Sequence, residues 1–281
     1  MKIAVTGSTG QLGRLVIEQL KQRVAASEIV ALARDTAKAA GLGVATRQAD
    51  YEDPASLNTA LAGIETLLLI SSSEIGKREL HHNNVITAAK AAGVNRIVYT
   101  SLLRADTSKL SLAGEHVATE TALRESGLNW TILRNGWYTE HYTASVPTAV
   151  QVGALTGRAG EGRISGATRA DLAEAAAVVV TTAGHDGETY ELAGDDAWTL
   201  AELAAEVSKQ TGKDIPYRDL PKAEYEKVLT GAGIPGGAAA VVAQFDVDAA
   251  RGELYHDGRQ LSELLGRSTT SLAEAVRAAL A

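Results

Sequence analysis

Short apolar runs alternate with longer segments of helical periodicity through the first half of the chain. The apolar runs, which predict buried strands, lie at residues 3–6, 29–32, 44–48, 67–70, 97–100 and 130–133. The intervening segments, which predict helices, lie at residues 12–20, 54–61, 85–92 and 117–123. Strands that alternate with helices along a chain form a parallel sheet covered on both faces. We therefore predict an α/β fold with a doubly wound parallel sheet.

The pattern changes after about residue 145. Scattered glycines and helical segments replace the regular alternation, and two capping boxes, Thr199 to Glu202 and Ser271 to Glu274, mark late helix starts. We predict a first domain at residues 1–145 and a smaller, mostly helical capping region at 146–281 that covers the substrate. The chain is free to cross back between the two.

The composition narrows the possible functions. The chain has 281 residues and no cysteine, which excludes disulfides, iron–sulfur clusters and cysteine nucleophiles. The net charge is −7 and no basic run is present, so we expect no nucleic-acid partner. No apolar stretch approaches the roughly 18 residues of a membrane span. The strand pattern that starts at residue 2 leaves no room for a signal peptide, so we expect a cytoplasmic protein.

The strongest motif follows the first predicted strand. It reads Thr6-Gly7-Ser8-Thr9-Gly10-Gln11-Leu12-Gly13, with three glycines at a three-residue spacing that lead into a helix. Glycine permits a tight turn and a close approach of the backbone to a ligand. The start of a helix offers unpaired N–H groups and a partial positive charge to a pyrophosphate. We interpret the motif as a dinucleotide-binding turn rather than a turn without a ligand.

The residue after the second strand indicates which dinucleotide binds. A site for NAD places an acid there, roughly 20 residues past the glycines, but this chain has Arg34. A guanidinium can hold a phosphate with two parallel hydrogen bonds, which favours NADPH. We interpret Asp35 as the cap of a short helix at 36–40, with Lys38 as a possible second positive charge. The alternative is that Arg34 is an ordinary solvated residue.

Polar residues also follow the third and fourth strands. Ser71, Ser72 and Ser73 come after the fourth strand, at the edge of the sheet where such folds bind ligands. They either meet a ribose or phosphate or form a polar turn. Asp50 ends the third strand, where it either accepts a hydrogen bond from an adenine amine or caps a turn.

At this point the sequence resembles the NmrA-like branch of the short-chain dehydrogenase/reductase superfamily. Within that branch it looks like the bacterial type 2 NAD(P)H:quinone oxidoreductases, with the triphenylmethane dye reductases as close cousins. The resemblance extends through nearly the whole chain, with matching motifs at residues 5–13, 48–51, 67–73, 88–93, 99–101, 133–138 and 190–194.

The resemblance implies a Rossmann-type domain and NADPH held by the glycine turn and Arg34. It also implies cofactor contacts from Ser71–Ser73 and from one further segment. That segment consists of Asn135, Gly136, Trp137, Tyr138, Thr139 and Glu140.

The helix after the fifth strand lacks the usual catalytic pair of the superfamily. Many short-chain dehydrogenases place a Tyr-x-x-x-Lys pair there for proton transfer, but residues 114–120 contain neither residue. His116 and Glu120 stand one turn apart and are able to form an exposed ion pair, which explains them structurally. His116 is a weak catalytic candidate, as is Tyr138, and no catalytic residue is firmly assigned.

Aromatic residues cluster after the sixth strand. The chain has only 8 Tyr, 3 Trp and 1 Phe, yet Trp137, Tyr138 and Tyr142 lie within eight residues. Flat rings at these positions suit a planar acceptor such as a quinone, while Asn135 is able to bond a carbonyl or a nicotinamide amide. The alternative role of the rings is to attach the second region to the first.

These observations predict an NADPH-dependent quinone reductase that works by direct hydride transfer, without flavin or metal. A quinone suits a site without a dedicated acid, because the developing anion is delocalised. Two alternatives remain: a redox-sensing regulator that binds the dinucleotide without turnover, and a reductase of planar dyes or other xenobiotics. No metal site is expected, because His81 and His82 should point in different directions on a helix. No oligomeric state is predicted.

Overall fold

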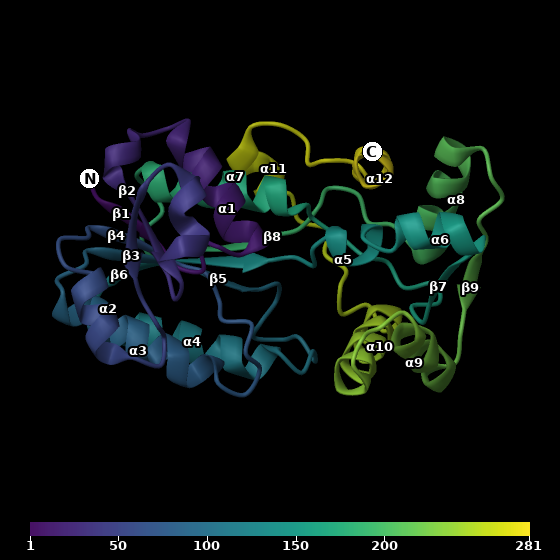
Figure 1. Ribbon diagram of the computed structural model, residues 1–281, viewed down its shortest axis with the longest axis horizontal. Helices are drawn as coiled ribbons and strands as arrows, with labels where there is room; N and C mark the ends of the chain where they lie inside the picture. Colours follow the sequence, from purple (N-terminus) through teal and green to yellow (C-terminus); the bar gives the residue numbers. More distant parts are fainter.

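A seven-stranded parallel sheet forms the centre of the larger part of the molecule. The computed structural model describes residues 1–281, and the strand order in this sheet is β3-β2-β1-β4-β5-β6-β8 (Figure 1). The strands are β1 (Ile3–Val5), β2 (Ile29–Ala33), β3 (Ala45–Gln48), β4 (Thr66–Leu69), β5 (Arg96–Leu102), β6 (Asn129–Asn135) and β8 (Thr189–Leu192). The order reverses between β1 and β4, which is where folds of this kind bind ligands.

Helices cover both faces of the sheet, as the sequence predicts (Figure 1). One face packs against α1 (Gln11–Lys21), α7 (Arg169–Thr181) and α11 (Gln260–Leu265). The other packs against α2 (Pro54–Ala60), α3 (Arg78–Ala91) and α4 (Ala113–Glu125). Along β1 the side chains alternate between these layers, so that Ile3 and Val5 join the first core and Ala4 the second. Two short 3-10 helices, η1 (Ala26–Glu28) and η2 (Thr36–Leu42), flank β2.

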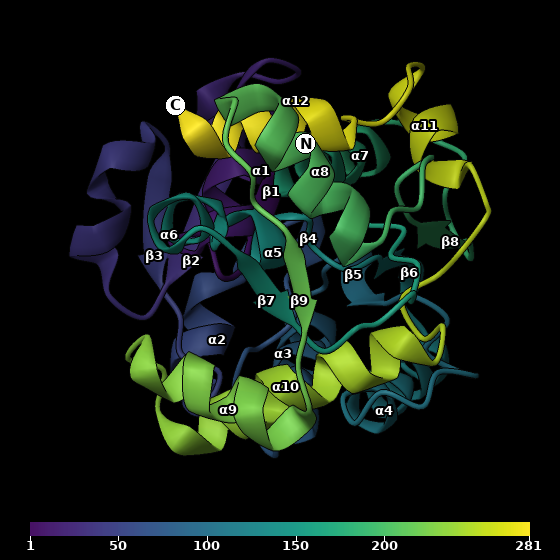
Figure 2. The same cartoon turned by 90° about the vertical axis from the view of Figure 1, so that its right-hand side faces the viewer.

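A smaller part, built around a two-stranded parallel sheet, lies beside the carboxyl edge of the large sheet (Figure 2). Its strands are β7 (Leu155–Gly157) and β9 (Tyr217–Asp219). Its helices are α5 (Glu140–Thr143), α6 (Val146–Val152), α8 (Leu200–Thr211), α9 (Lys222–Gly231), α10 (Gly236–Ala250) and α12 (Leu272–Leu280). This part has its own core, in which Trp198, Leu203 and Val207 are buried.

The chain crosses between the two parts more than once. After α6 and β7 it returns to the large sheet, where α7 packs beside α1 and β8 pairs with β6. It leaves again for α8, β9, α9 and α10, and α11 comes back beside α7. Residues 169–192 of the expected capping region therefore belong to the sheet and its helical layer, so a boundary at residue 145 does not separate the two cores.

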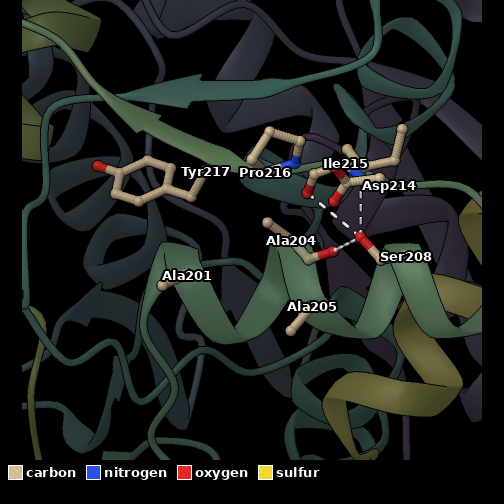
Figure 3. Close-up of a pocket in the computed structure, with 8 residues that line it drawn as sticks. All are labelled: Ala201, Ala204, Ala205, Ser208, Asp214, Ile215, Pro216 and Tyr217. Atoms are coloured by element: carbon tan, nitrogen blue, oxygen red, sulfur yellow. Dashed lines mark hydrogen bonds between the residues drawn. The ribbon is translucent and has the colours of Figure 1, made fainter.

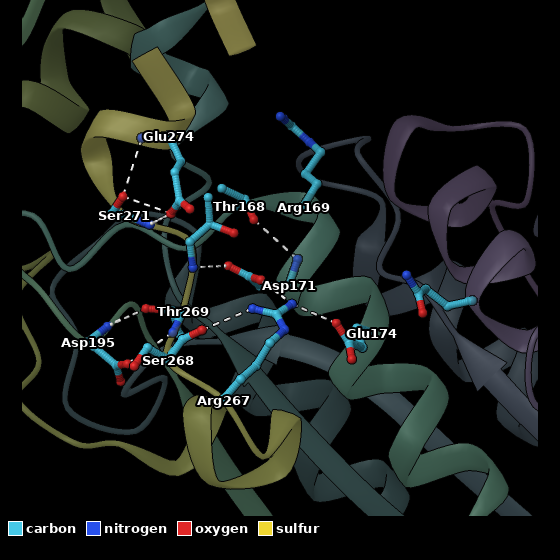
Figure 4. Close-up of polar contacts among 12 residues, drawn as sticks. Thr168, Arg169, Asp171, Glu174, Asp195, Arg267, Ser268, Thr269, Ser271 and Glu274 are labelled. Atoms are coloured by element: carbon cyan, nitrogen blue, oxygen red, sulfur yellow. Dashed lines mark hydrogen bonds and ion pairs between the residues drawn. The ribbon is translucent and has the colours of Figure 1, made fainter. Parts of the chain in front are cut away.

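The segment at residues 266–271, here called the strap, connects α11 to α12 and ties the two parts together. Figure 4 shows Arg267 reaching Asp171 on α7, with its guanidinium 2.8 Å from the carboxylate. Further along the strap, Thr269 exchanges two hydrogen bonds with Asp195, at 2.9 and 3.0 Å. Arg267 also pairs with Glu174 at 2.6 Å, so the strap is held by three carboxylates that come from residues far earlier in the chain.

None of the helices combines the length and the apolar character that a bilayer span requires.

Candidate cofactor and acceptor site

A cleft of about 410 Å³ opens at the carboxyl edge of the large sheet, where β1, β2 and β4 end. Its walls include most of the residues that the sequence predicts for the dinucleotide: Thr6, Gly7, Thr9, Gly10, Gln11, Leu12, Gly13, Arg34, Asp50, Ser71, Ser72, Ser73 and Tyr138. The wall also includes residues for which the sequence predicts no cofactor contact, among them Tyr51, Glu52, Glu74, His81 and Arg169. The fold therefore brings residues from distant segments to one site.

The glycine turn leaves backbone N–H groups free at the start of α1. Gly7 has a φ of +56°, in the left-handed region that glycine tolerates. Gly10 is the N-cap of α1, with no side-chain cap and no acidic residue in the first turn. The N–H groups of the first turn have no partner inside a helix, so they are available to an anion. A Cβ on Gly13 would collide with the carbonyl oxygen of Gly7, so this glycine lets α1 pack against the turn.

Two hydroxyls of the turn are occupied by the protein itself. Thr6 Oγ1 accepts a hydrogen bond from the N–H of Ile70 at 2.9 Å. Ser8, which is fully buried, donates from Oγ to the carbonyl oxygen of Leu32 at 2.8 Å. These side chains hold the turn against β2 and β4, while Thr9 and Gly10 line the cleft.

Arg34 lies at the end of β2, at the rim of the cleft. Its Nη1 is 3.1 Å from Oε1 of Glu74, and its side chain remains 70% exposed. Asp35 caps η2 as predicted, because its Oδ1 accepts a hydrogen bond from the N–H of Ala37 at 3.0 Å. Lys38 also lines the cleft, so two cationic side chains stand at the position expected for a phosphate.

Asp50 and Ser71 also line the cleft, after β3 and β4. Oδ1 of Asp50 accepts a hydrogen bond from the N–H of Glu52 at 3.0 Å, which closes a local turn. The N–H of Ser71 donates to the hydroxyl of Thr100 at 2.9 Å. Both residues therefore stabilise loops as well as line the cleft, and both readings that the sequence allowed for Asp50 remain compatible with its position.

Ser72 is anchored by three side chains of α3. Its N–H donates to Nε2 of His82 at 2.9 Å, and its hydroxyl lies 2.9 Å from Nδ1 of His81. Its carbonyl oxygen accepts from Nε of Arg78, also at 2.9 Å, and Arg78 pairs with Glu115 at 2.7 Å. The two histidines thus converge on one residue instead of pointing apart, because the loop after β4 runs back across the first turn of α3.

Burial lowers the pKa of His82 to about 2, with His116 and Arg78 adding a smaller effect of the same sign. The ring is therefore neutral. Because Nε2 accepts from Ser72, the proton lies on Nδ1 and is donated to the hydroxyl of Thr119 at 2.9 Å. The Ser71–Ser73 loop is therefore held by a neutral histidine together with the Arg78–Glu115 ion pair.

His116 and Glu120 do not form the exposed pair that the sequence suggested. Both are buried, and Nδ1 of His116 bonds the hydroxyl of Tyr99 at 2.7 Å. Glu120 instead pairs with Arg134 at 2.8 Å and accepts from the hydroxyl of Ser101 at 2.6 Å. Burial, and then the charge of Arg78, lower the pKa of His116 to about 3. His116 is a neutral core residue that does not line the cleft, because its hydrogen-bond partner, Tyr99, lies on β5 inside the core.

The segment after β6 connects the sheet to the cleft wall. Asn135 is 5% exposed, and its Oδ1 has no hydrogen-bond partner within the protein. Tyr138 lines the cleft, with the guanidinium of Arg169 over its ring at 4.3 Å. Glu140 fixes that arginine, because its Oε1 accepts from the N–H of Arg169 at 2.9 Å. Burial raises the pKa of Tyr138, so its hydroxyl stays neutral.

Other residues of this segment serve the framework. The N–H of Gly136 donates to the carbonyl oxygen of Leu192 at 2.7 Å, and a Cβ there would come within 2.8 Å of the same oxygen. Thr139 is buried, and its N–H donates to the carbonyl oxygen of Ala167 at 3.0 Å. Gly136 thus joins the end of β6 to the end of β8, and Thr139 contacts the segment between β7 and α7. Neither residue lines the cleft.

The aromatic cluster is divided between the cleft and the core of the smaller part. Trp137 packs against Phe245 of α10, with ring centroids 4.8 Å apart. Tyr142 is only 8% exposed, donates its hydroxyl to Asp246 at 3.1 Å and meets Trp198 edge-on. Tyr142 is therefore not in the cleft wall where a stacking role requires it. The helical turn of α5 directs it into the core, as the attachment role suggested.

Three side chains at the cleft rim carry atoms of the kind that bind metals. Atoms of Glu52, Glu74 and His81 lie within 4.8 Å of one another. The protein already engages them, because Glu52 pairs with Lys77 at 2.7 Å and Glu74 pairs with Arg34. His81 is bound to Ser72 through Nδ1, so this cluster belongs to the charge network of the cofactor cleft.

A second hollow, of about 470 Å³, lies between α8 and the segment that enters β9 (Figure 3). Its wall is formed by alanines of α8 and by Ile215, Pro216 and Tyr217. Ser208 is its main polar contact and is bonded to Ile215, whose N–H donates to the hydroxyl at 3.0 Å. The hollow shares no residue with the cofactor cleft and has no titratable pair suited to catalysis.

Comparison with known proteins places this architecture in a family. A family model described as NAD(P)H-binding matches residues 7–205, which include the glycine turn, Arg34, Tyr138 and Arg169. The chain belongs to the NAD(P)H-binding, NmrA-like family. The predicted resemblance and the Rossmann-type fold are both confirmed.

Curated and solved relatives cover nearly the whole chain. Quinone oxidoreductase 2 of Escherichia coli K12 is 56% identical, over 98% of this chain and 97% of the relative. The crystal structure of the E. coli NADPH-dependent quinone oxidoreductase QOR2 complexed with NADPH has a TM-score of 0.95 at 55% identity, over 99% of this chain and 100% of that one. Triphenylmethane reductase of Citrobacter sp. has a TM-score of 0.97 at 38% identity, over 100% and 99% of the two chains.

Proposed function

We propose that this chain is an NADPH-dependent quinone reductase that transfers hydride directly to its acceptor. The observation that carries the proposal is the single cleft that joins the glycine turn, Arg34 and Tyr138 at the edge where the strand order reverses. The 56% identity to the E. coli quinone oxidoreductase supports the same class of acceptor.

The residues present fit NADPH. The free N–H groups at the start of α1 suit a pyrophosphate, and Arg34 with Lys38 suits the additional phosphate that distinguishes NADPH from NADH. The unpartnered Oδ1 of Asn135 is a buried acceptor that a carboxamide N–H of the cofactor would satisfy. When bound, NADPH supplies the hydride.

The protein contributes orientation rather than a dedicated acid. The helix that carries Tyr-x-x-x-Lys in many relatives of this superfamily here directs His116 and Glu120 inward, to Tyr99 and Arg134. Tyr138, held under Arg169, offers a flat ring at the cleft wall against which a planar acceptor can lie. A reduced quinone anion is delocalised and takes its proton from water after the hydride transfer, so the transfer itself needs mainly the correct positioning of the nicotinamide and acceptor rings.

The decisive experiment combines purified protein, NADPH and a simple benzoquinone. We expect loss of reduced-nicotinamide absorbance that depends on the protein, in material first freed of flavin and treated with chelator. An Arg34→Ala variant provides a matched control, because it should weaken NADPH about tenfold or more while changing NADH much less. Dependence of the activity on added flavin would contradict direct transfer.

A second acceptor class deserves the same assay, because triphenylmethane reductase shares this fold at 38% identity. A triphenylmethane dye replaces the quinone, and the ratio of kcat/KM values for the two acceptors decides between them. Binding of NADPH without turnover of any planar acceptor would favour the regulator instead. The cytoplasmic location expected from the sequence stays a prediction, which cell fractionation tests.

A further inference from the structure

The arginine that should select NADPH is already engaged by an acid of the protein. Nη1 of Arg34 is 3.1 Å from Oε1 of Glu74. Arg34 follows β2 and Glu74 lies in the loop after β4, on opposite sides of β1 in the sheet. The ion pair therefore spans the rim of the cleft at the point where the strand order reverses.

Glu74 is held at this position by the loop beneath it. Its N–H donates to the hydroxyl of Ser72 at 3.3 Å, and Ser72 is anchored in turn to His82. Its other carboxylate oxygen lies 3.6 Å from Nζ of Lys77. The Glu74 side chain is 38% exposed, so it faces the cleft and solvent rather than the core.

The charges at this rim nearly cancel. Arg34 and Lys38 are cationic, while Asp35 lies 4.0 Å from Lys38 and Glu74 lies beside Arg34. A 2′-phosphate carries close to two negative charges and seeks the same guanidinium that Glu74 occupies. NADH has only a hydroxyl at that position and leaves the ion pair undisturbed.

We propose that Glu74 sets the cofactor preference of this chain by competing with the 2′-phosphate of NADPH for Arg34. The inference rests on the cofactor cleft of the proposed function and adds a residue to it. Arg34 alone would make NADPH bind more tightly than NADH, and Glu74 reduces this difference in affinity. Glu74 is thus a specificity residue that acts through Arg34, and it has no part in hydride transfer.

The test measures dissociation constants of NADPH and NADH directly, by titration calorimetry without quinone. In Glu74→Gln, we expect the NADPH dissociation constant to fall about threefold to tenfold and that of NADH to stay within about twofold. Glu52→Gln is the matched control, because it removes one negative charge from the same cleft but contacts Lys77 and His81 rather than Arg34. Its effect on the ratio of the two constants should be clearly smaller.

A double-mutant cycle tests whether Glu74 acts through Arg34. In an Arg34→Ala background, Glu74→Gln should no longer tighten NADPH binding, because the two residues act as one unit. The proposal is overturned by equal changes for NADPH and NADH, by an equal gain in Glu52→Gln, or by a gain that persists without Arg34. Melting curves of each variant confirm folding. A failure of quinone turnover would defeat the proposed function while leaving these binding constants measurable.

Discussion

At the scale of single residues, the degree of burial distinguishes side chains that line the cleft from side chains that stabilise the fold. The position of Arg34 at the cleft is predictable from the sequence, because it follows directly on β2 and β2 is evident from its apolar residues. The position of Arg169 is not, because it reaches Tyr138 only after the chain has passed through the smaller part. The sequence left two roles open for Tyr142 and could not decide between them, because its partner, Asp246, lies on a helix that no local pattern connects to it.

Replacement of Tyr138 tests whether its ring or its hydroxyl matters. Tyr138→Phe should keep most of the quinone activity, since the pKa of the hydroxyl is raised by burial and the ring remains under Arg169. Tyr138→Ala should raise the acceptor KM or lower kcat/KM, with NADPH affinity within a few-fold by direct titration. A loss of roughly 10²–10⁴ in rate for Tyr138→Phe, with an altered pH profile, would instead identify a general acid.

At the scale of elements, the alternation of apolar and polar residues predicted the first six strands and the helices between them. These elements form from neighbouring residues, so their signals are local. β8 gave no such signal, because it joins the sheet through pairing with β6 and through the return of α7 to α1. The convergence of His81 and His82 on Ser72 also depends on a loop path that periodicity does not encode.

The glycine turn offers a matched pair of substitutions. Gly13→Ala should lower the free energy of unfolding by about 1–3 kcal/mol or more, because its Cβ would collide with the backbone at Gly7. Gly10→Val should mainly impair NADPH binding. A Cβ at residue 10 would meet only one protein atom, the carbonyl oxygen of Gly7 at 3.2 Å, so the added side chain would occupy the cleft instead. Urea unfolding and NADPH titration of both variants check the contrast. If the two variants lost stability and NADPH affinity to the same extent, Gly10 and Gly13 would not have the separate roles proposed here.

At the scale of the whole molecule, two parts are joined by crossings of the chain, and residues of the larger part line the cofactor cleft. The sequence indicated two regions but not how they interleave, since α7 and β8 complete the large sheet only after β7 has formed part of the small one. Titratable side chains are buried in both parts, among them His82, His116 and Asp246, and their protonation ties the free energy of unfolding to pH.

Acid should destabilise the protein as the pH falls below about 6.5. The folded-state pKa values of His82 and His116 are lowered by burial to about 2 and about 3, so the unfolded chain binds more protons below their ordinary pKa of 6.5. Each histidine should contribute a loss of about 1.4 kcal/mol per pH unit in that range. Urea unfolding between roughly pH 7 and pH 5 measures the slope.

Asp246 should oppose this trend over part of the range. Burial raises its pKa from 3.8 to about 6, so the folded chain binds the extra proton between these values and gains stability as the pH falls through 6. Asp246→Asn should therefore steepen the acid loss between about pH 6 and pH 4. If the free energy of unfolding of the parent protein did not change with pH, the two histidines would not be neutral in the fold. If Asp246→Asn left the profile unchanged, the pKa of Asp246 would not be raised.

The strap also determines when the molecule can be completed during synthesis. Asp171, with a side chain 1% exposed, precedes its cation Arg267 by 96 residues. A ribosome adds about 5–20 residues per second, so this carboxylate waits roughly 5–20 seconds for its partner. Burying an unpaired charge costs several kcal/mol, so we expect the Asp171 carboxylate to stay in contact with solvent until the strap arrives. A nascent chain therefore has every strand of its large sheet before the ion pair between the strap and α7 can form.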